Sequence, residues 1–432
     1  MLTHHPRVLA LGILLLLSGL MGCSKPKPAS LDEALALYRQ NRLEQALPQF
    51  ERLASEDQTN AEVLSWLAET YRRLGKKGEA VRTARLALRS DPCNSFAHTV
   101  MAEAMNPVVE QWEGANSDST WLHVMKAVEC DSTDGNPWLL VWGESMRRGD
   151  PEMLHKCLRT LDHSGFLTKA ALAYGRWMLR ALPRNAILLT NGDMDTYPPC
   201  AVQEVEGFRR DVVVVNRGTL NVPWYARFIR DHEGVTLPFT DVELDRLSAY
   251  RDSRGIVQLP SDQIFRGWLD EKERGAFSRP LAITVTVDEE FFSAVRQHLR
   301  FCGAFWLWQE TPASEAPDLA LMEASLEGQK PEDFSGPWVS EGDRSPIRRI
   351  GTKRLVQNIT TTALSCSERL IEVGQLSEAE RWLGWAEELE SKSELGPSLT
   401  DRIAHLKQEI ARRQRSTVVR GLADPNSDFG DT

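Results

Sequence analysis

The chain has 432 residues, enough for two or three domains. Its 61 acidic residues outnumber its 51 basic ones, and this net charge of −10, with both signs interspersed, gives no support for nucleic-acid binding. None of the seven cysteines stands in a CxxC pair or in metal-ligand spacing. We interpret the six beyond Cys23 as small residues of helices and strands, and we expect no disulfide framework.

Residues 1–22 have the organisation of an export signal. An apolar run at 8–17 follows Arg7 and is shorter than the about 20 residues that span a membrane. The run LMGC at 20–23 then resembles the lipobox of bacterial lipoproteins, in which the cysteine receives the lipid, with Met21 as a less usual occupant. The alternative is an ordinary signal peptide, or an uncleaved anchor, with a chance cysteine.

The lipobox resemblance implies that Cys23 carries acyl chains, which would anchor the protein at a membrane. Residues 23–30, rich in Ser, Lys and Pro, would be a tether between the lipid and the folded body. Ser24 stands where lipoproteins of the inner membrane commonly have Asp. The resemblance therefore implies a palmitoylated lipoprotein of the cell envelope, on the periplasmic side of the outer membrane if the cell has two membranes.

Residues 61–94 form one unit of 34 residues, in which an apolar helix face, a turn at Gly75 and a helix face of small residues follow one another. This unit resembles the tetratricopeptide repeat nearly position for position, with Leu64 where Trp is usual. The positions that would pack the paired helices together are Leu64, Leu67, Ala68, Tyr71, Ala80, Ala84, Ala87 and Pro92.

Degenerate copies of this unit flank it. The earlier copy has Ala34, Ala46 and Phe50 at the corresponding positions, and a later copy begins at Ser95. Because one helix pair cannot bury its apolar face alone, we predict a tetratricopeptide-like array over 31–182, with an unrelated helical bundle as the alternative. Helices are expected near 119–130, 138–148, 151–161 and 167–182. The resemblance implies a protein partner on the concave face of the array.

The hydrophobic period changes after residue 184. Short apolar runs at 186–191 and 212–216, with a helical segment between them, predict a parallel βαβ unit. Strands at 281–288 and 304–309, joined by a helix over 289–303, would complete a small α/β domain over 184–310.

Polar residues follow both strands of the βαβ unit. Asn191, Asp193 and Asp195 follow the first strand, and Asn216 ends the second. Ligands of open α/β sheets bind beyond the carboxyl ends of the strands, so these residues are candidates to hold a divalent cation or sugar hydroxyls. The structural alternative is that they form a turn and cap the next helix. The loop is too poor in glycine for a phosphate cradle, and no order typical of Ser/His/Asp or Cys/His nucleophiles is present.

The block TNGDMDTYPPCAVQEVEGFRRDVVVVNRGTLNVPWY at 190–225 carries a second resemblance. It is similar to a block of large bacterial membrane proteins classed with protein O-mannosyltransferase-like enzymes, glycosyltransferase family 117. The segments RPLAITVTVDEE and LRFCGAFWLWQ within 279–309 are similar to later segments of that family, so the resemblance covers about 184–310. The matching residues are Gly192, Asp193, Asp195, Thr196, Pro198, Gln203, Glu204, Val205, Glu206, Gly207, Arg209, Asp211, Val212, Val214, Val215, Asn216, Leu220, Asn221, Trp224 and Tyr225. The transferase chemistry of that family is thought to lie in a preceding membrane half. The resemblance therefore implies a shared accessory domain rather than an inherited transferase activity.

The remaining sequence predicts a loop-rich connection over 311–350 and, over 351–415, a helical pair followed by a closing helix. Residues 416–432 are expected to be a disordered tail.

The sequence thus predicts a mostly α protein, a tetratricopeptide-like α-solenoid with a small inserted α/β domain. The leading functional hypothesis is a non-enzymatic, membrane-anchored interaction or scaffold protein of the bacterial envelope, connected with surface-glycan or glycosylation machinery and needing no cofactor. A rival hypothesis is a carbohydrate-binding or glycosyl-transfer-related protein that uses the strand-end residues. A structural envelope module without a ligand is the third.

Overall fold

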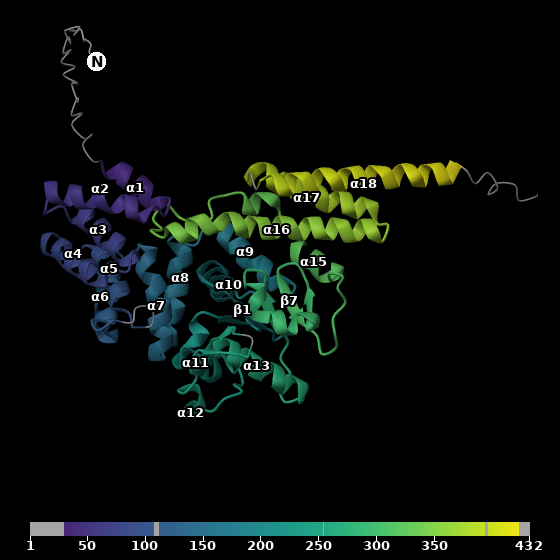
Figure 1. Ribbon diagram of the computed structural model, residues 1–432. Coiled ribbons are helices and arrows are strands. Elements are labelled where there is room, and N and C mark those ends of the chain that lie inside the picture. The colour runs from purple at the N-terminus through teal and green to yellow at the C-terminus, as the bar shows by residue number, and fades with distance from the viewer. Residues whose placement is uncertain (1–29, 108–111, 254, 394–395, 423–432) are drawn as a thin grey trace, which may run out of the picture.

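The computed structural model describes residues 30–107, 112–253, 255–393 and 396–422. The expected export signal at 1–22, Cys23 and most of the expected tether at 23–30 lie outside these residues. Within the described residues, no helix combines the length and apolar character needed to cross a membrane. The fold has three parts: a helical array, a small sheet with its own helices, and three long C-terminal helices that lie along both (Figure 1).

The array consists of antiparallel helix pairs, which confirms the tetratricopeptide-like fold class. Its helices are α1 (Leu31–Arg39), α2 (Leu43–Glu56), α3 (Ala61–Arg73), α4 (Lys77–Ser90), α5 (Ser95–Met105), α6 (Ser117–Cys130), α7 (Gly135–Arg148), α8 (Pro151–His163) and α9 (Lys169–Arg180). Asn60 and Asn94 cap the helices α3 and α5 by accepting backbone N–H groups of the first turn. Asp134 and Asp150 do the same for α7 and α8.

The repeat positions lie where paired helices meet, with two exceptions. Leu64, Leu67, Ala68, Ala80, Ala84 and Ala87 are buried. Tyr71 is half-buried, and its hydroxyl donates a hydrogen bond to Glu51. Pro92 is exposed in the turn after α4. The four alanines have no exposed surface, since a larger side chain would separate the helices that cross at these points.

A disulfide joins Cys93, before α5, to Cys130, at the end of α6. The expectation of no disulfide is therefore wrong for this pair. The two cysteines are 37 residues apart in the sequence, and only the antiparallel packing of α5 on α6 brings them together. Cys157, Cys302 and Cys366 are buried free thiols, and Cys200 is a half-buried one.

A five-stranded sheet follows the array, in the order β2-β1-β5-β7-β6. Its strands are β1 (Ile187–Thr190), β2 (Val213–Asn216), β5 (Leu281–Thr284), β6 (Leu299–Phe301) and β7 (Phe305–Trp308). The first three are parallel, with α10 (Asp193–Glu206) crossing between β1 and β2, which confirms the βαβ unit. In Figure 1 the sheet lies between α9 and α10 on one side and α11 (Pro223–Glu233) and α13 (Pro260–Glu273) on the other.

The segment 289–303 is not the helix that its sequence suggested. It forms α14 (Glu289–Phe292), a 3-10 helix (Ser293–His298) and then strand β6. Gly303 has φ +89° and turns the chain from β6 into the antiparallel strand β7, and a Cβ there would lie 2.6 Å from Thr362. The hairpin pairing overrides the helical period. The chain between α11 and α13, for which no element was expected, contains α12 (Asp241–Leu244), β3 (Tyr250–Arg251) and β4 (Val257–Gln258).

The C-terminal helices also differ from the expected limits. The connection at 311–350 contains α15 (Leu319–Leu326), and α16 (Pro346–Glu372) begins inside it, because Ser345 caps the helix and Pro346 suits its first position. After α17 (Leu376–Ser393), α18 (Pro397–Leu422) extends into the expected disordered tail. That prediction is wrong for 416–422, since extending a formed helix requires no new nucleation. Residues 423–432 lie outside the described part.

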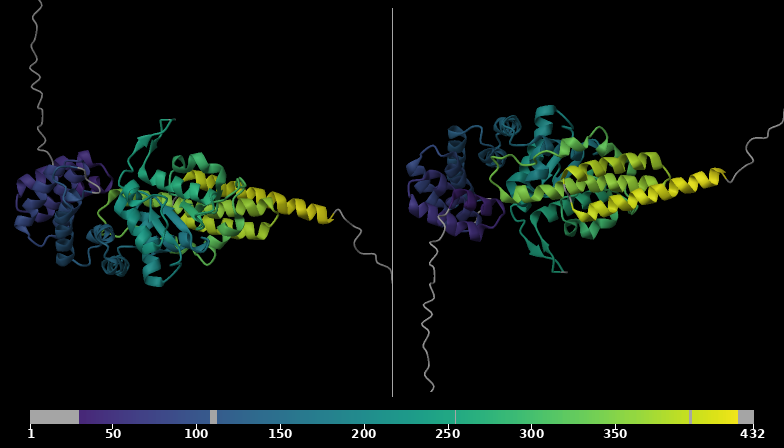
Figure 2. Two further views of the ribbon diagram at one scale, coloured as in Figure 1. Left: turned by 90° about the horizontal axis from the view of Figure 1, so that it is seen from below. Right: turned by 90° about the horizontal axis from the view of Figure 1, so that it is seen from above.

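Helix α16 runs from the array, where it contacts α1, along the sheet part, and α17 and α18 pack against it (Figures 1 and 2). The hydrophobic core follows this arrangement. One cluster of buried side chains joins α6–α9, the sheet and α16–α18, whereas two smaller clusters lie within α1–α5. The C-terminal half of the array and the sheet therefore share one core.

Two helical glycines provide a matched test of this packing. A Cβ on Gly175 in α9 would lie 2.7 Å from the backbone of Pro198 in α10, whereas a Cβ on Gly143 in α7 would meet nothing within 4 Å. We expect Gly175→Ala to lower the free energy of unfolding by about 1–3 kcal/mol. Gly143→Ala should raise it by up to about 1 kcal/mol through helix propensity. Urea unfolding measures both, and equal effects would contradict the close approach of α9 and α10.

Candidate functional site

A cavity of about 510 Å³ opens at the carboxyl ends of β1 and β5. Its lining comes from three parts of the chain: Arg73 of α3, the loop from Asn191 to Asp195 with Thr286, and the first turns of α16 from Ser345 to Leu355. The strand-end edge therefore faces the array and the start of α16.

Asp195 lines this cavity, but its carboxylate is used in hydrogen bonds that stabilise the fold. Its carboxylate accepts the N–H groups of Asn191 (2.7 Å) and Gly192 (2.8 Å), and so caps α10 from the third position of the helix. It also accepts the hydroxyls of Thr284 and Thr286. Burial raises its pKa although these hydrogen bonds oppose the shift. Asp195 therefore joins β1, β5 and α10, as the structural alternative proposed.

Asp193 is the more accessible carboxylate, with 45 % of its side chain exposed. Its Oδ2 lies 2.8 Å from Nη1 of Arg348, and Arg348 also donates two hydrogen bonds of 2.7 Å to Asp343. Asn191 is exposed at the same cavity. A ligand there would meet the Asn191 amide, a carboxylate whose charge Arg348 balances, and the side chains of Arg73 and Arg354.

Asn216 does not belong to the cavity. Its side chain donates to Thr196 (3.0 Å) and accepts from the Thr219 N–H group (2.8 Å), so it fixes the turn after β2. The structure thus brings Asn191, Asp193 and Asp195 to one cavity and separates Asn216 from it. Among the described residues, no group of three or more His, Cys, Asp or Glu side chains could hold a metal ion.

A buried charge network lies beside this cavity, on the first helices of the repeats. Glu69 of α3 binds Arg72 (2.7 Å) and Arg73 (2.6 Å), and Arg72 also binds Glu103 of α5 (2.7 Å). The hydroxyl of Tyr38 donates to Glu69 at 3.0 Å. Burial alone would raise the pKa of Glu69, but the charges and hydrogen bonds of the two arginines lower it to about 2.

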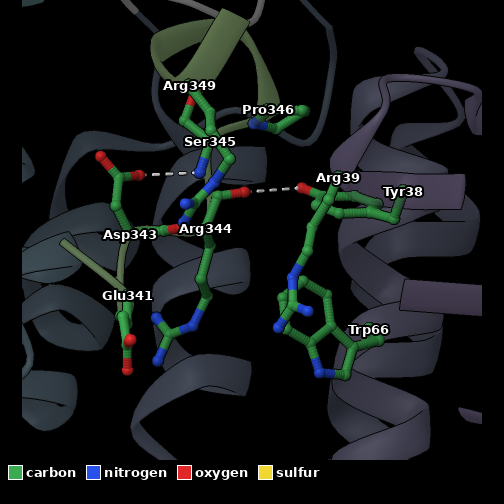
Figure 3. Close-up of a pocket in the computed structure, with 10 residues that line it drawn as sticks. Tyr38, Arg39, Trp66, Glu341, Asp343, Arg344, Ser345, Pro346 and Arg349 are labelled. Carbon is green, nitrogen blue, oxygen red and sulfur yellow. Dashed lines mark hydrogen bonds between the residues drawn. The ribbon is translucent and has the colours of Figure 1, made fainter. Parts of the chain in front are cut away.

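Next to this charge network, the aromatic rings of Tyr38, Trp66 and Phe96 form a row across α1, α3 and α5, which we call the aromatic ladder. The rings of Tyr38 and Trp66 are 5.1 Å apart, and those of Trp66 and Phe96 are 4.7 Å apart, both edge to face. Residues 341–346 face the ladder across a cavity of about 180 Å³, and Figure 3 shows the Tyr38 hydroxyl bonded to the Arg344 carbonyl. We call the side of the array formed by α1, α3, α5 and α7 its inner face. This face is therefore in contact with the chain's own C-terminal half.

The sequence did not indicate this second surface. Tyr38, Trp66 and Phe96 fit ordinary packing positions of helices, and Arg344 falls in a segment that resembles a loop. Their partners lie far away in the sequence. The Arg344 N–H group, for example, donates to the side chain of Asn136, and these two residues are 208 positions apart. The only local signs are the caps Asp134 and Ser345, which mark the starts of α7 and α16.

Comparisons with known proteins agree with two of the resemblances, the tetratricopeptide repeat and the block at 190–225. Residues 37–104 match the family model described as Tetratricopeptide repeat. Residues 171–262, from α9 to the start of α13, match TMEM260-associated domain 2, which fits the resemblance to O-mannosyltransferase-like proteins. No curated protein matches the chain. The chain therefore carries tetratricopeptide repeats, a module that binds proteins, next to a TMEM260-associated segment.

Two solved structures are similar in part. TTC0263, a thermophilic TPR protein of Thermus thermophilus, has 18% identity over 50% of this chain and 93% of its own, with a TM-score of 0.30. The TPR domain of P58(IPK) has 11% identity over 89% of this chain and 98% of its own, with a TM-score of 0.17. Because both TM-scores are below 0.5, the repeat assignment rests on the family match and on the helix pairs.

The charge network predicts a dependence of stability on pH. Because the pKa of Glu69 is about 2 in the folded chain and 4.5 as its ordinary value, its contribution is present above pH 4.5 and is lost as the pH falls toward 2. Glu69→Gln should lower the free energy of unfolding at pH 7 by about 3–5 kcal/mol and flatten its pH dependence between 2 and 4.5. The matched control is Glu62→Gln, an exposed residue of the same helix. Urea unfolding across this range checks both, and parallel curves for wild type and Glu69→Gln would contradict the assignment.

Proposed function

We propose that this protein is a lipid-anchored interaction protein of a bacterial envelope, in which the tetratricopeptide array binds a protein partner. The observation that carries the proposal is the repeat module at 37–104, since such modules recognise proteins. The TMEM260-associated segment at 171–262 supports a partner within envelope glycosylation machinery. The protein itself acts by binding, without a catalytic step.

Two further features support the location. The LMGC run ending at Cys23 fits a lipid attachment site, with a polar tether behind it. The disulfide between Cys93 and Cys130 fits an oxidising compartment such as the periplasm, because cytosolic thiols are kept reduced. The proposed location is the periplasmic side of the outer membrane where the cell has two membranes.

A second candidate function is binding of a small polar ligand, such as a sugar, in the cavity at Asn191 and Asp193. The specific observation in its favour is the volume of about 510 Å³ at the carboxyl ends of two parallel strands. Against it stands the pairing of Asp193 with Arg348. Titration with a panel of monosaccharides decides, because unchanged NMR spectra at millimolar sugar would exclude this function.

The anchor is tested by Cys23→Ser in a bacterial host that processes lipoproteins. We expect wild type to fractionate with membranes and to begin at a Cys23 that carries three acyl chains. The variant should lose the lipid and leave the membrane fraction. Mass spectrometry of the N-terminal peptide measures this, with Cys200→Ser as the matched control. An unlipidated N-terminus in wild type would contradict the proposal.

Partner binding is tested by cross-linking the intact protein in the same envelopes. Exposed lysines lie on both parts, Lys76 and Lys126 on the array and Lys392 and Lys407 on the C-terminal helices. Intermolecular cross-links should concentrate on 31–182. Cross-links confined to the C-terminal helices would contradict the role of the array.

A further inference from the structure

Residues 342–345 cross the inner face of the array as a short strap, and successive residues contact opposite sides. Gly342 and Arg344 contact helices of the array. Asp343 and Ser345 contact the start of α16: Asp343 binds Arg348, and Ser345 caps the helix. Gly342 belongs to a turn that the hydrogen bond from the Asp343 N–H group to the Ser340 carbonyl closes, and residues 343–345 then run without helix or strand to α16. The alternation of contacts still presents one side of the strap to the array, as in a peptide that lies in a groove.

The first contact is a clamp on the backbone of the strap. The side chain of Asn136, which is 6 % exposed, donates to the Gly342 carbonyl (2.8 Å) and accepts the Arg344 N–H group (3.1 Å). The Tyr38 hydroxyl, whose single proton is shared between Glu69 and the strap, lies 3.1 Å from the Arg344 carbonyl. These hydrogen bonds recognise the backbone of the strap and do not depend on which side chains it carries.

The second contact recognises one side chain. The guanidinium of Arg344 lies 2.8 Å from Asp134 and 4.1 Å above the ring of Phe96. Asp134 is itself held by the Ser95 hydroxyl and by its role as the cap of α7. A carboxylate together with an aromatic face is selective for arginine, because lysine cannot match both the planar stacking and the directed hydrogen bonds.

The strap neither fills the groove nor finds, within the described part of the chain, hydrogen-bond partners for all of its own polar atoms. Nη1 of Arg344 is buried without a hydrogen-bond partner among the described residues. A cavity of about 180 Å³ remains between the strap and the rings of Tyr38 and Trp66. A longer or bulkier segment could therefore make contacts that residues 342–345 do not make.

We propose that the inner face of the array, from Tyr38 to Asn136, is a binding groove for an extended protein segment that carries an arginine. In the free protein the strap occupies this groove as an internal ligand, and the partner segment replaces it. This inference rests on the proposed function of the array as the partner-binding part. Because the strap is covalently attached, its effective concentration at the groove is high, and an external segment binds weakly until the strap is weakened.

The test uses the intact chain and a labelled peptide of residues 338–347, WVSEGDRSPI. The substitution Arg344→Ala removes the strap's own arginine from its position beside Asp134 and Phe96. The peptide should therefore bind to this variant at least tenfold more tightly than to wild type, as measured by fluorescence anisotropy. Adding Asn136→Ala should abolish this gain, and a peptide with Ala in place of its arginine should not bind. Glu332→Ala is the matched control, since this exposed residue of the same connection lies outside residues 341–346 and should leave the wild-type affinity unchanged.

Equal affinity of wild type and folded Arg344→Ala for the peptide would overturn the proposal, as would equal binding of the two peptides. Circular dichroism establishes folding. If the variant is unfolded, hydrogen exchange of wild type decides: a saturating peptide should speed exchange at 340–346, and an unchanged rate overturns the inference. Partner cross-links on the array together with a failed peptide test would reject only the internal ligand and leave the proposed function standing.

Discussion

Two arginines four residues apart join the repeat array to the sheet. Arg344 binds Asp134 at the start of α7, and Arg348 binds Asp193 at the start of α10. Asp343 lies next to Arg344 in the sequence and holds Arg348 in place. Half-buried pairs of this kind add little net stability, but breaking one leaves a charge without compensation. Their main effect is geometric, because they fix the strap between the groove and the strand-end cavity.

This constraint explains why the two candidate surfaces differ in chemistry. At the strand ends, Asp195 is used by the fold and Asp193 is neutralised by Arg348, so few polar groups remain for a ligand. On the inner face of the array, aromatic rings, a carboxylate and an amide are directed at a peptide backbone and an arginine. The second arrangement is typical of protein recognition, in agreement with the repeat module.

The sequence predicted the parts of the structure that depend on local patterns. The 34-residue period located the repeats, and two apolar runs with a helix between them located the parallel strands β1 and β2. Contacts between distant residues left no such pattern. The pairing of Cys93 with Cys130 and the clamp of Asn136 on Arg344 depend on how helices pack in three dimensions. The sequence left open whether Asp195 binds a ligand or caps the next helix, and only its bonds to Asn191 and Gly192 decide for the cap.

We expect the strap to hold the first helices of the array, α1–α4, whose buried residues lie outside the common core, in a fixed position relative to the sheet and α16. Electron–electron distance measurement tests it most directly, with spin labels on unnatural residues at Glu62 of α3 and Glu378 of α17, both on the surface. We expect one narrow distribution of distances between the two labels in wild type, and a broad distribution in the double variant Arg344→Ala/Arg348→Ala. The same narrow distribution in both proteins would contradict it.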